Sequence, residues 1–240
     1  LVVFPGNIIH FEVGRKKSIA AIEWAMSNNN AVFLTAQQDM DVEDPGFKDL
    51  YAYGVVAEVK QVLRVSDELV KVLVEGKYRA KLLTLDSSGR FLLASTKAAA
   101  LRGTKSVDSA RVEALVRSVK EAFEEYLSLN PRLSKDVVYT IITNEDAALL
   151  CDYIPANLLL KYTDKQALLN EGTVSGRLEK LLEILRRETK ILHIEKDIQS
   201  KVNEQMDKNQ RDYYLREQMR AISNELDDFD DTREEAEEYK

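Results

Sequence analysis

The 240-residue sequence is poor in residues that cross-link or interrupt a chain, with one cysteine, four prolines and nine glycines. The single cysteine excludes an internal disulfide framework and suits a reducing cytosol, so we expect a cytoplasmic protein. Cys151 lies in the apolar run 147–151, which predicts a buried and unreactive thiol. The two histidines, His10 and His193, cannot form a zinc cluster with one cysteine, and both are interpreted as surface or capping residues.

Long apolar runs are also absent. No run approaches the ~18 residues that a membrane-spanning helix needs. No signal or transit peptide is recognisable at the start of the chain. The sequence begins at Leu1 without a methionine and ends within an acidic run, so we expect it to be part of a longer protein.

Catalytic signatures are missing as well. The sequence has no Gly-x-Ser-x-Gly, Gly-x-Gly-x-x-Gly or His-Glu-x-x-His motif. Residues 103–106 read Gly-Thr-Lys-Ser, but a phosphate-binding loop needs a glycine directly before the lysine and another five positions earlier. We therefore predict no catalytic residue, no cofactor-binding residue and no metal site in this chain.

Charged residues are plentiful, with 34 basic and 41 acidic residues and a net charge of −7. The acidity is concentrated at the end, because residues 221–240 contain 9 Asp and Glu against 2 Lys and Arg. Residues 177–220 contain 9 acidic against 11 basic residues, and residues 1–176 contain 23 against 21. No stretch is basic enough for non-specific nucleic-acid binding, so nucleic acid is not an expected partner.

Residues 1–103 are rich in the alternation of apolar and polar positions that is typical of half-buried strands. The alternation is clearest over 55–65 and 70–82, and a short polar turn separates these two runs. A helix is expected over 16–27, and the three asparagines at 28–30 are expected to end it. Successive strands joined by short turns pair antiparallel. We predict a twisted antiparallel sheet that curls toward a small barrel, with one helix inserted.

The run 70–82 contains one glycine, Gly76, which predicts a bulge or bend at that point. The alternation assigns Tyr78 to the apolar side of this strand and Arg79 to its polar side.

From residue 104 to residue 176 the apolar period changes from 2 to 3.6, which predicts a helical bundle. Ser134 and Asn144 are interpreted as N-caps of two of its helices. The spacing of Thr163 and Gln166 is typical of a capping box at the start of another helix.

The stretch 177–226 contains no proline and no glycine, which predicts one helix roughly 75 Å long. Its start carries an apolar stripe at helical spacing, formed by Leu178, Leu181, Leu182 and Leu185. Between 198 and 212 the apolar residues are too few to hold a helix in a core: Ile198, Val202 and Met206. We therefore expect a helix that is rooted in the bundle and then leaves it, followed over 227–240 by a solvated or disordered acidic linker.

The end of this helix carries an aromatic and thioether surface, formed by Met206, Tyr213, Tyr214, Met219 and Ile222. We interpret these residues as candidate partner contacts, because such side chains are enriched at interfaces. In the alternative interpretation the helix end folds onto a downstream domain of its own chain. Both interpretations imply interaction and not catalysis.

Several motifs, in this order along the chain, resemble those of the Lon ATP-dependent protease family. Residues 1–6 (Leu-Val-Val-Phe-Pro-Gly) and 13–18 (Val-Gly-Arg-Lys-Lys-Ser) are similar to the opening of that family, and 163–166 (Thr-Asp-Lys-Gln) to its Ala-Asp-Lys-Gln. Residues 210–218 resemble its Gln-Arg-Glu-Tyr-Tyr-Leu-Asn-Glu-Gln stretch, which lies just before the ATPase module. One departure is that residues 223–226 (Ser-Asn-Glu-Leu) replace the usual Gln-Lys-Glu-Leu.

The resemblance implies an α+β fold. An antiparallel, β-rich, PUA-like pseudo-barrel that serves as the substrate domain (1–103) precedes an α-helical bundle (104–176) and one very long protruding helix (177–226). The acidic linker (227–240) would lead toward an ATPase module. The resemblance also implies that the sites for ATP and Mg and a Ser–Lys peptidase dyad lie downstream in the parent protein, so no catalytic residue is carried over to this chain.

Two functional hypotheses follow. In the first, the chain is the non-catalytic amino-terminal region of a Lon protease, which recruits unfolded or tagged protein substrates and supports a homohexamer, away from membranes. In the second, it is a free-standing scaffold or adaptor that uses the long helix as a coiled coil. The irregular apolar spacing argues against a sustained heptad seam. A Gly-x-x-x-x-Gly-Lys-Ser/Thr motif beyond Lys240 in the parent reading frame would decide for the protease.

Overall fold

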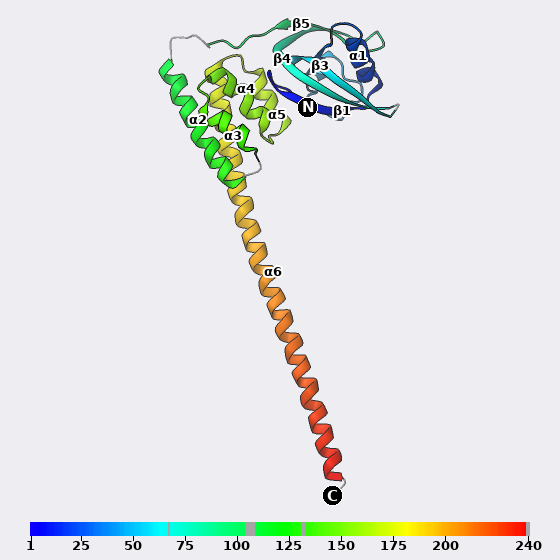
Figure 1. The fold of residues 1–240 in the computed structure, drawn as a ribbon, viewed down its shortest axis with the longest axis vertical. Helices are drawn as coiled ribbons and strands as arrows, with labels where there is room; N and C mark the ends of the chain where they lie inside the picture. The colour runs from blue at the N-terminus through cyan, green and yellow to red at the C-terminus, as the bar shows by residue number, and fades with distance from the viewer. Residues whose placement is uncertain (67, 104–108, 131–132, 239–240) are drawn as a thin grey trace. The chain divides into compact units, whose positions relative to one another are not determined.

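The strands and helices follow one another in two blocks, with the sheet first and most of the helices after it (Figure 1). The computed structural model describes all residues except 67, 104–108, 131–132 and 239–240, and it describes 109 and 223–238 by their backbone alone. The chain divides into two units, Leu1–Thr189 and Lys190–Lys240.

The described part of the first unit contains one antiparallel sheet. Its strands are β1 (Ile8–Val13), β2 (Ala31–Leu34), β3 (Tyr53–Ser66), β4 (Leu69–Asp86) and β5 (Leu93–Ala98). The order is β1-β4-β3-β2, and β5 also pairs with β4. Because β1 pairs with residues 70–75 of β4 and β5 with residues 80–86, the two short strands lie along one long strand. The antiparallel pairing predicted from short turns is confirmed.

The inserted helix α1 (Lys16–Met26) packs its apolar face onto the sheet. Ile19 and Ile22, three positions apart, join the apolar core formed by β3, β4 and the end of β1. The helix ends as expected at the asparagines. Asn30 adopts a left-handed backbone with a φ of 55°, which asparagine tolerates better than most residues, and its N–H donates to the carbonyl of Ala25 at 2.8 Å.

The predicted bulge in β4 is confirmed. The register between β3 and β4 shifts at Gly76, where Lys77 has no directly opposed partner on β3. Gly76 also exchanges hydrogen bonds with the turn after Phe4, and a Cβ atom on it would lie 2.3 Å from the Phe4 carbonyl oxygen. Directly after the bulge the predicted sidedness is wrong for Tyr78 and Arg79, because the extra residue interrupts the alternation, whereas Ala80 and Leu82 are buried as predicted. Tyr78 is 48% exposed, whereas Arg79 is only 6% exposed.

Helices α2 (Ser109–Leu129), α3 (Lys135–Thr143), α4 (Ala147–Asn157) and α5 (Tyr162–Asn170) gather around the start of α6 (Figure 1). Ser134 caps α3 as predicted, because its side chain accepts from the Val137 N–H. The N-cap of α4 is Asp146 and not the predicted Asn144. The Asp146 carboxylate accepts two backbone N–H groups of the first turn, while the Asn144 side chain accepts only the N–H of Asp146.

The predicted capping box at Thr163 and Gln166 is also wrong. α5 begins at Tyr162 with Lys161 as its N-cap residue, so Thr163 already lies inside the helix. Gln166 points away from the helix start, is buried, and donates from its amide to the Tyr53 carbonyl at 2.8 Å. Its polar side chain therefore joins α5 to the sheet instead of capping the helix.

The long helix α6 runs from Val174 to Glu238, which is further in both directions than the predicted 177–226. It begins early because Gly176 fits the first turn, where a Cβ would lie 2.7 Å from the Thr173 hydroxyl oxygen. The acidic stretch after 226 is helical through Glu238 and does not form the expected linker. That stretch has no proline or glycine, and its last five residues are four Glu and one Ala, which favour helix.

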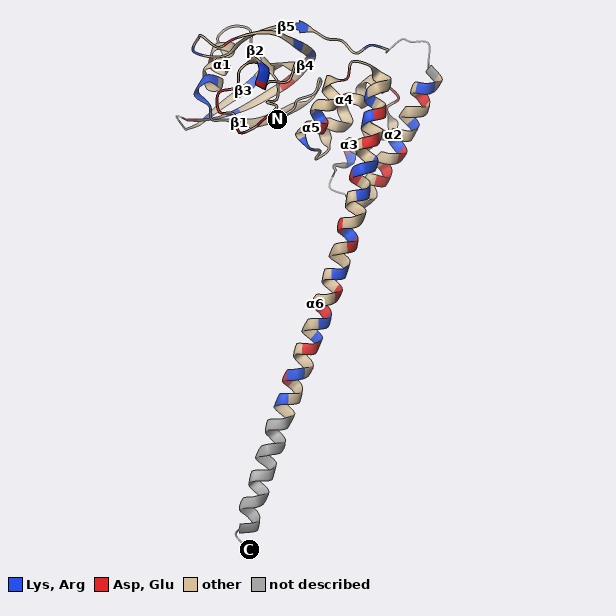
Figure 2. Ribbon diagram, turned by 180° about the vertical axis from the view of Figure 1, so that it is seen from behind, with Lys and Arg blue, Asp and Glu red and all other residues tan. Residues whose placement is uncertain are grey.

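Burial changes along α6. Leu178, Leu181 and Leu185 are fully buried, whereas Leu182 is only half-buried. In the second unit every residue from His193 to Ile222 is exposed, as expected for Ile198 and its neighbours. Basic and acidic residues are interspersed along the same stretch (Figure 2). No helix in the described part of the chain is long and apolar enough to cross a membrane.

Candidate functional site

An apolar cavity of about 530 Å³ lies between α1 and the sheet in the first unit. Its walls come from β1, β2, the first turns of α1 and parts of β4, together with the segment after β2. Its apolar lining includes Phe11, Val32, Leu34, Leu50, Leu85 and Leu92. Three of these, Phe11, Val32 and Leu34, are only half-buried and lie against the apolar core. The cavity therefore offers an apolar group a site with a preformed wall.

Two strand edges border this cavity. β1 pairs only with β4, and β2 pairs only with β3, within the residues that the structure describes. Each strand therefore has one edge outside the sheet's hydrogen-bond ladder. β2 reads Ala-Val-Phe-Leu and contains none of the charged residues or prolines that protect exposed edges in many proteins. Such edges can pair with an extended polypeptide.

The rim of the cavity is polar. Arg15 Nη1 donates to Gln37 Oε1 at 2.8 Å, and Lys17 Nζ lies 2.8 Å from Asp44 Oδ1. These contacts tie the start of α1 to the loop that follows β2. The charged members are exposed, so the rim holds the loop in place without burying charge. In the described residues no group of three His, Cys, Asp or Glu side chains could hold a metal ion.

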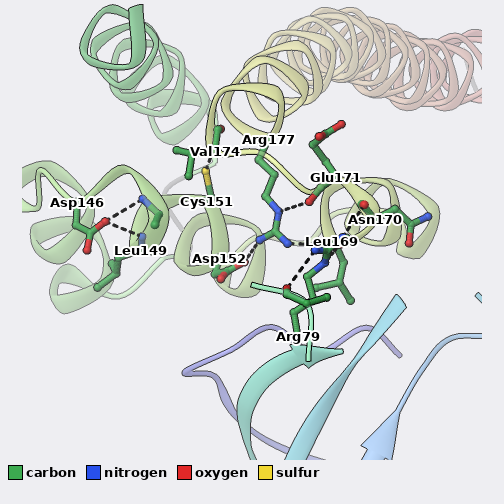
Figure 3. A network of polar contacts seen from close by, with 12 residues as sticks. Arg79, Asp146, Leu149, Cys151, Asp152, Leu169, Asn170, Glu171, Val174 and Arg177 are labelled. Atoms are coloured by element: carbon green, nitrogen blue, oxygen red, sulfur yellow. Dashed lines mark hydrogen bonds and ion pairs between the residues drawn. The ribbon is translucent and has the colours of Figure 1, made fainter. Parts of the chain in front are cut away.

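A second polar network joins the sheet to the helices (Figure 3). Arg79 of β4 donates from Nε to the Leu169 carbonyl at 2.6 Å and from Nη2 to the Asn170 carbonyl at 2.7 Å. Its guanidinium also lies 4.0 Å from the centre of the Tyr53 ring, a cation–π contact. Arg79 thus ends α5 by satisfying carbonyls that have no partner within the helix.

Arg177, near the start of α6, completes the network from the helical side (Figure 3). It is fully buried, forms an ion pair with Asp152 of α4, and donates from Nε to the Glu171 carbonyl at 3.0 Å. It also donates to the Leu169 carbonyl at 3.4 Å, the same oxygen that Arg79 contacts. The two arginines therefore hold the end of α5 between β4, α4 and α6.

Burial sets the acid–base behaviour of this network. Desolvation lowers the pKa of Arg79, and the nearby charge of Arg177 lowers it further. Desolvation also raises the pKa of Asp152, although the neighbouring Arg177 acts in the opposite direction. The neighbouring Cys151 is fully buried, as predicted, and burial raises the pKa of its thiol to about 12. None of these groups has access to a substrate, so we assign the network a structural role.

The residues predicted to contact a partner all lie on α6 in the second unit. Met206, Tyr213, Tyr214, Met219 and Ile222 are between 54% and 72% exposed. The one side-chain hydrogen bond described for this set is from Gln218 Nε2 to the Tyr214 hydroxyl at 3.0 Å, within the same helix. Their assignment as partner contacts stays a prediction.

Sequence reasoning missed both the cavity and the arginine network. The cavity is lined by apolar residues that any core would contain, and they come from segments far apart in the sequence. Arg79 was placed on the polar side of its strand because local alternation cannot detect a carbonyl 90 residues away. An arginine directly before the apolar stripe of α6 was the only local signal for Arg177.

Comparisons with known proteins agree with one another. The profile of the ATP-dependent protease La (LON) substrate-binding domain matches residues 1–187. The Lon protease of Escherichia coli (strain K12) is 40% identical over 240 residues, which are all of this chain and 30% of that protein. The Lon protease of Clostridioides difficile (strain 630) is 37% identical over 243 residues, and the match covers 31% of that protein.

Solved structures show the same fold. The N-terminal domain of Lon protease from the Mycobacterium avium complex has a TM-score of 0.62 at 21% sequence identity, and the match covers 77% of this chain and 92% of that domain. The chain spans about 30% of the length of the curated relatives that it matches. With its antiparallel sheet, its helices and its long terminal helix, the chain belongs to the Lon protease family, as an N-terminal region with the substrate-binding domain.

Proposed function

We propose that this chain recruits unfolded or tagged protein substrates for an ATP-dependent Lon-type serine protease and catalyses no reaction itself. The match of residues 1–187 to a substrate-binding domain is the observation that carries the proposal. The apolar cavity supports it, because an unfolded chain exposes apolar side chains that a native protein buries.

The free edges of β1 and β2 suggest how binding tolerates many sequences. Backbone N–H and C=O groups are the same in every substrate, so pairing along an edge gives affinity without selecting a sequence. An apolar side chain of the bound segment would then enter the cavity. A folded protein offers neither an extended backbone nor a free apolar side chain, and this difference discriminates against native proteins.

The rest of the parent protein supplies the chemistry in this proposal. ATP and Mg bind in a downstream ATPase module, and a downstream Ser–Lys dyad cleaves the substrate. The parent assembles as a cytoplasmic homohexamer, and α6 sets the reach from the recruiting domain to the ATPase ring. The exposed residues from Tyr213 to Ile222 contact other parts of the assembly. The exposed, mixed-charge surface of α6 supports a spacer better than a coiled-coil scaffold, which would need a sustained apolar seam.

The test measures binding of an uncharged, fluorescein-labelled peptide rich in Leu and Phe, and of an unfolded model protein, to the 240-residue chain. Ala21 lines the cavity and is half-buried, so Ala21→Trp should fill the space and weaken binding at least about tenfold. Ala110→Trp adds the same side chain to an exposed position of α2 and should change binding less than twofold. Equal affinities for both variants would contradict the cavity as the site.

A second experiment uses the full enzyme. Deletion of residues 1–176 should abolish degradation of protein substrates while cleavage of a short fluorogenic peptide continues, because a small peptide can diffuse to the peptidase without recruitment. Undiminished degradation of an unfolded protein by the deleted enzyme would contradict the recruiting role.

A further inference from the structure

A second depression lies beside α1. Of the residues that line it, only Lys17 also lines the apolar cavity. The second depression encloses about 370 Å³ and is bordered by α1, β3 and the loop between β4 and β5. Its lining contains four basic side chains and one acidic side chain: Lys16, Lys17, Arg64, Arg90 and Glu23, with the small or apolar Ile19 and Ala20 between them. The depression is basic in a protein whose net charge is −7.

The basic groups of this depression are incompletely neutralised. Arg64 and Arg90 share one carboxylate, that of Glu23, at 3.1 and 4.0 Å. Their side chains remain 60% and 83% exposed. Lys17 pairs with Asp44 outside the lining, and no carboxylate in the described part of the chain lies within ion-pair distance of Lys16. The site therefore has a surplus of positive charge that is open to a ligand.

An aromatic pair stands next to these charges. Trp24 follows Glu23 in α1, and Phe91 follows Arg90 in the loop before β5. Their ring centroids are 5.5 Å apart with the planes tilted by 38°, and Trp24 is 46% exposed. An exposed indole beside a cationic surface can receive an aromatic or large apolar side chain that is flanked by acidic residues.

We propose that this depression, with Lys16, Arg64 and Arg90 in its lining and Trp24 next to Glu23 of that lining, binds acidic segments of protein substrates that carry an aromatic residue. The proposal rests on the proposed function and adds a second site, with its own substrate chemistry, to the apolar cavity. Each exposed ion pair is weak alone and is screened by salt, so the site acts mainly by steering acidic substrates to the domain and by slowing their release.

Charge complementarity favours an acidic polypeptide over a nucleic acid here. Non-specific binding to nucleic acid uses many phosphate contacts along an extended basic surface, whereas this depression has four cations. Glu23 lies among them and would repel a continuous line of phosphates. A peptide with spaced carboxylates and an uncharged aromatic residue avoids that repulsion.

Fluorescence anisotropy with the 240-residue chain tests the proposal. The probe is a fluorescein-labelled ten-residue peptide of Asp, Glu and Ser with one central Trp. We expect binding that weakens at least about tenfold between 50 and 500 mM NaCl. Lys16→Glu/Arg90→Glu should weaken binding at 50 mM NaCl at least about tenfold. Lys97→Glu/Lys135→Glu makes the same change of charge at exposed positions outside the depression and should change it less than threefold.

Further controls test the role of the aromatic residue and separate a specific site from a general charge effect. Replacing the central Trp of the probe by Ser, or Trp24→Ala in the protein, should each weaken binding several-fold. Equal losses for the two charge-reversed variants would overturn the proposal, because they would indicate a general charge effect. Tighter binding of a single-stranded oligonucleotide of the same charge would also overturn it.

The two peptides and the two variants test the apolar cavity and the acidic-segment site separately. Ala21→Trp should weaken binding of the uncharged apolar peptide without changing binding of the acidic peptide. Lys16→Glu/Arg90→Glu should weaken binding of the acidic peptide without changing binding of the apolar one. If Ala21→Trp weakens binding of the apolar peptide while neither variant changes binding of the acidic peptide, the result would support the proposed function and contradict the acidic site. Lys16→Gln/Arg90→Gln removes charge without reversing it and should weaken binding of the acidic peptide less than the Glu variant does. This variant serves as a control for an effect of charge reversal on folding.

Discussion

At the scale of single residues, the buried polar groups explain why the sheet and the helices form one unit. Arg79 and Arg177 are charged, yet they lie in the interior because backbone carbonyls and Asp152 satisfy their donors. Buried charges are retained where their partners are complete, because removal of one partner leaves an uncompensated charge. The end of α5 is the shared partner, so these contacts specify how the helices meet β4.

Cys151 carries a prediction about pH. Its ordinary pKa is 9.0 and burial raises it to about 12 in the folded protein, so the unfolded thiol ionises first. The stability that this difference supplies is present below pH 9 and is lost as the pH rises from 9 toward 12. Between pH 7.5 and 10 the free energy of unfolding should fall by about 1.4 kcal/mol more in the wild type than in Cys151→Ala.

Urea unfolding of both proteins at the two pH values measures this difference. The variant lacks the thiol but keeps every lysine and tyrosine, so the titration of those groups cancels in the comparison. Parallel losses of stability in the two proteins would mean that the thiol ionises equally in both states.

At the scale of elements, α6 serves two purposes along one continuous helix. Its first turns bury Leu178, Leu181 and Leu185, and the helix from His193 to Ile222 exposes every side chain. The absence of proline, and of glycine after Gly176, allows both parts to stay helical, but only the first part gains stability from packing. The amphipathic stripe was therefore predictable from the sequence. The burial of each member was not, because Leu182 belongs to the stripe by its spacing but is only half-buried.

This division of α6 predicts contrasting effects of the same kind of substitution. Leu181→Asp should lower the free energy of unfolding by about 3 kcal/mol or more, because it places a carboxylate in the core. Ile198→Asp should cost less than about 1 kcal/mol, since Ile198 is 57% exposed. Leu182→Asp should fall between the two. Chemical denaturation followed by circular dichroism measures all three, and equal losses would mean that α6 is buried throughout.

At the scale of the whole molecule, the buried residues identify the part of the chain that folds cooperatively. Every buried residue in the described part of the chain lies between Val2 and Thr189. The substrate-binding domain profile ends at nearly the same place, at residue 187. The first unit is therefore the folding unit, and the second adds helix without adding core.

Truncation after Thr189 tests this conclusion. The shortened chain should keep a single cooperative thermal transition, with a midpoint within about 4 °C of the full chain, the shift that 1 kcal/mol produces in a protein of this size. Its helical circular dichroism signal should fall, because residues of α6 have been removed. A midpoint lowered by more than about 10 °C would show that the second unit stabilises the first.

The sequence by itself determined the antiparallel strands of the sheet and the helical character of the part after it, apart from the acidic end, together with the bulge at Gly76, the buried thiol and the exposed stretch of α6. Each of these follows from local periodicity or from a single residue type, and local physics decides them. Only the tertiary structure decided that Arg79 is buried, that Gln166 joins α5 to the sheet, and that a cavity opens between α1 and the sheet. Those features depend on partners 90 or more residues away and on segments far apart in the sequence, and no local pattern encodes such contacts.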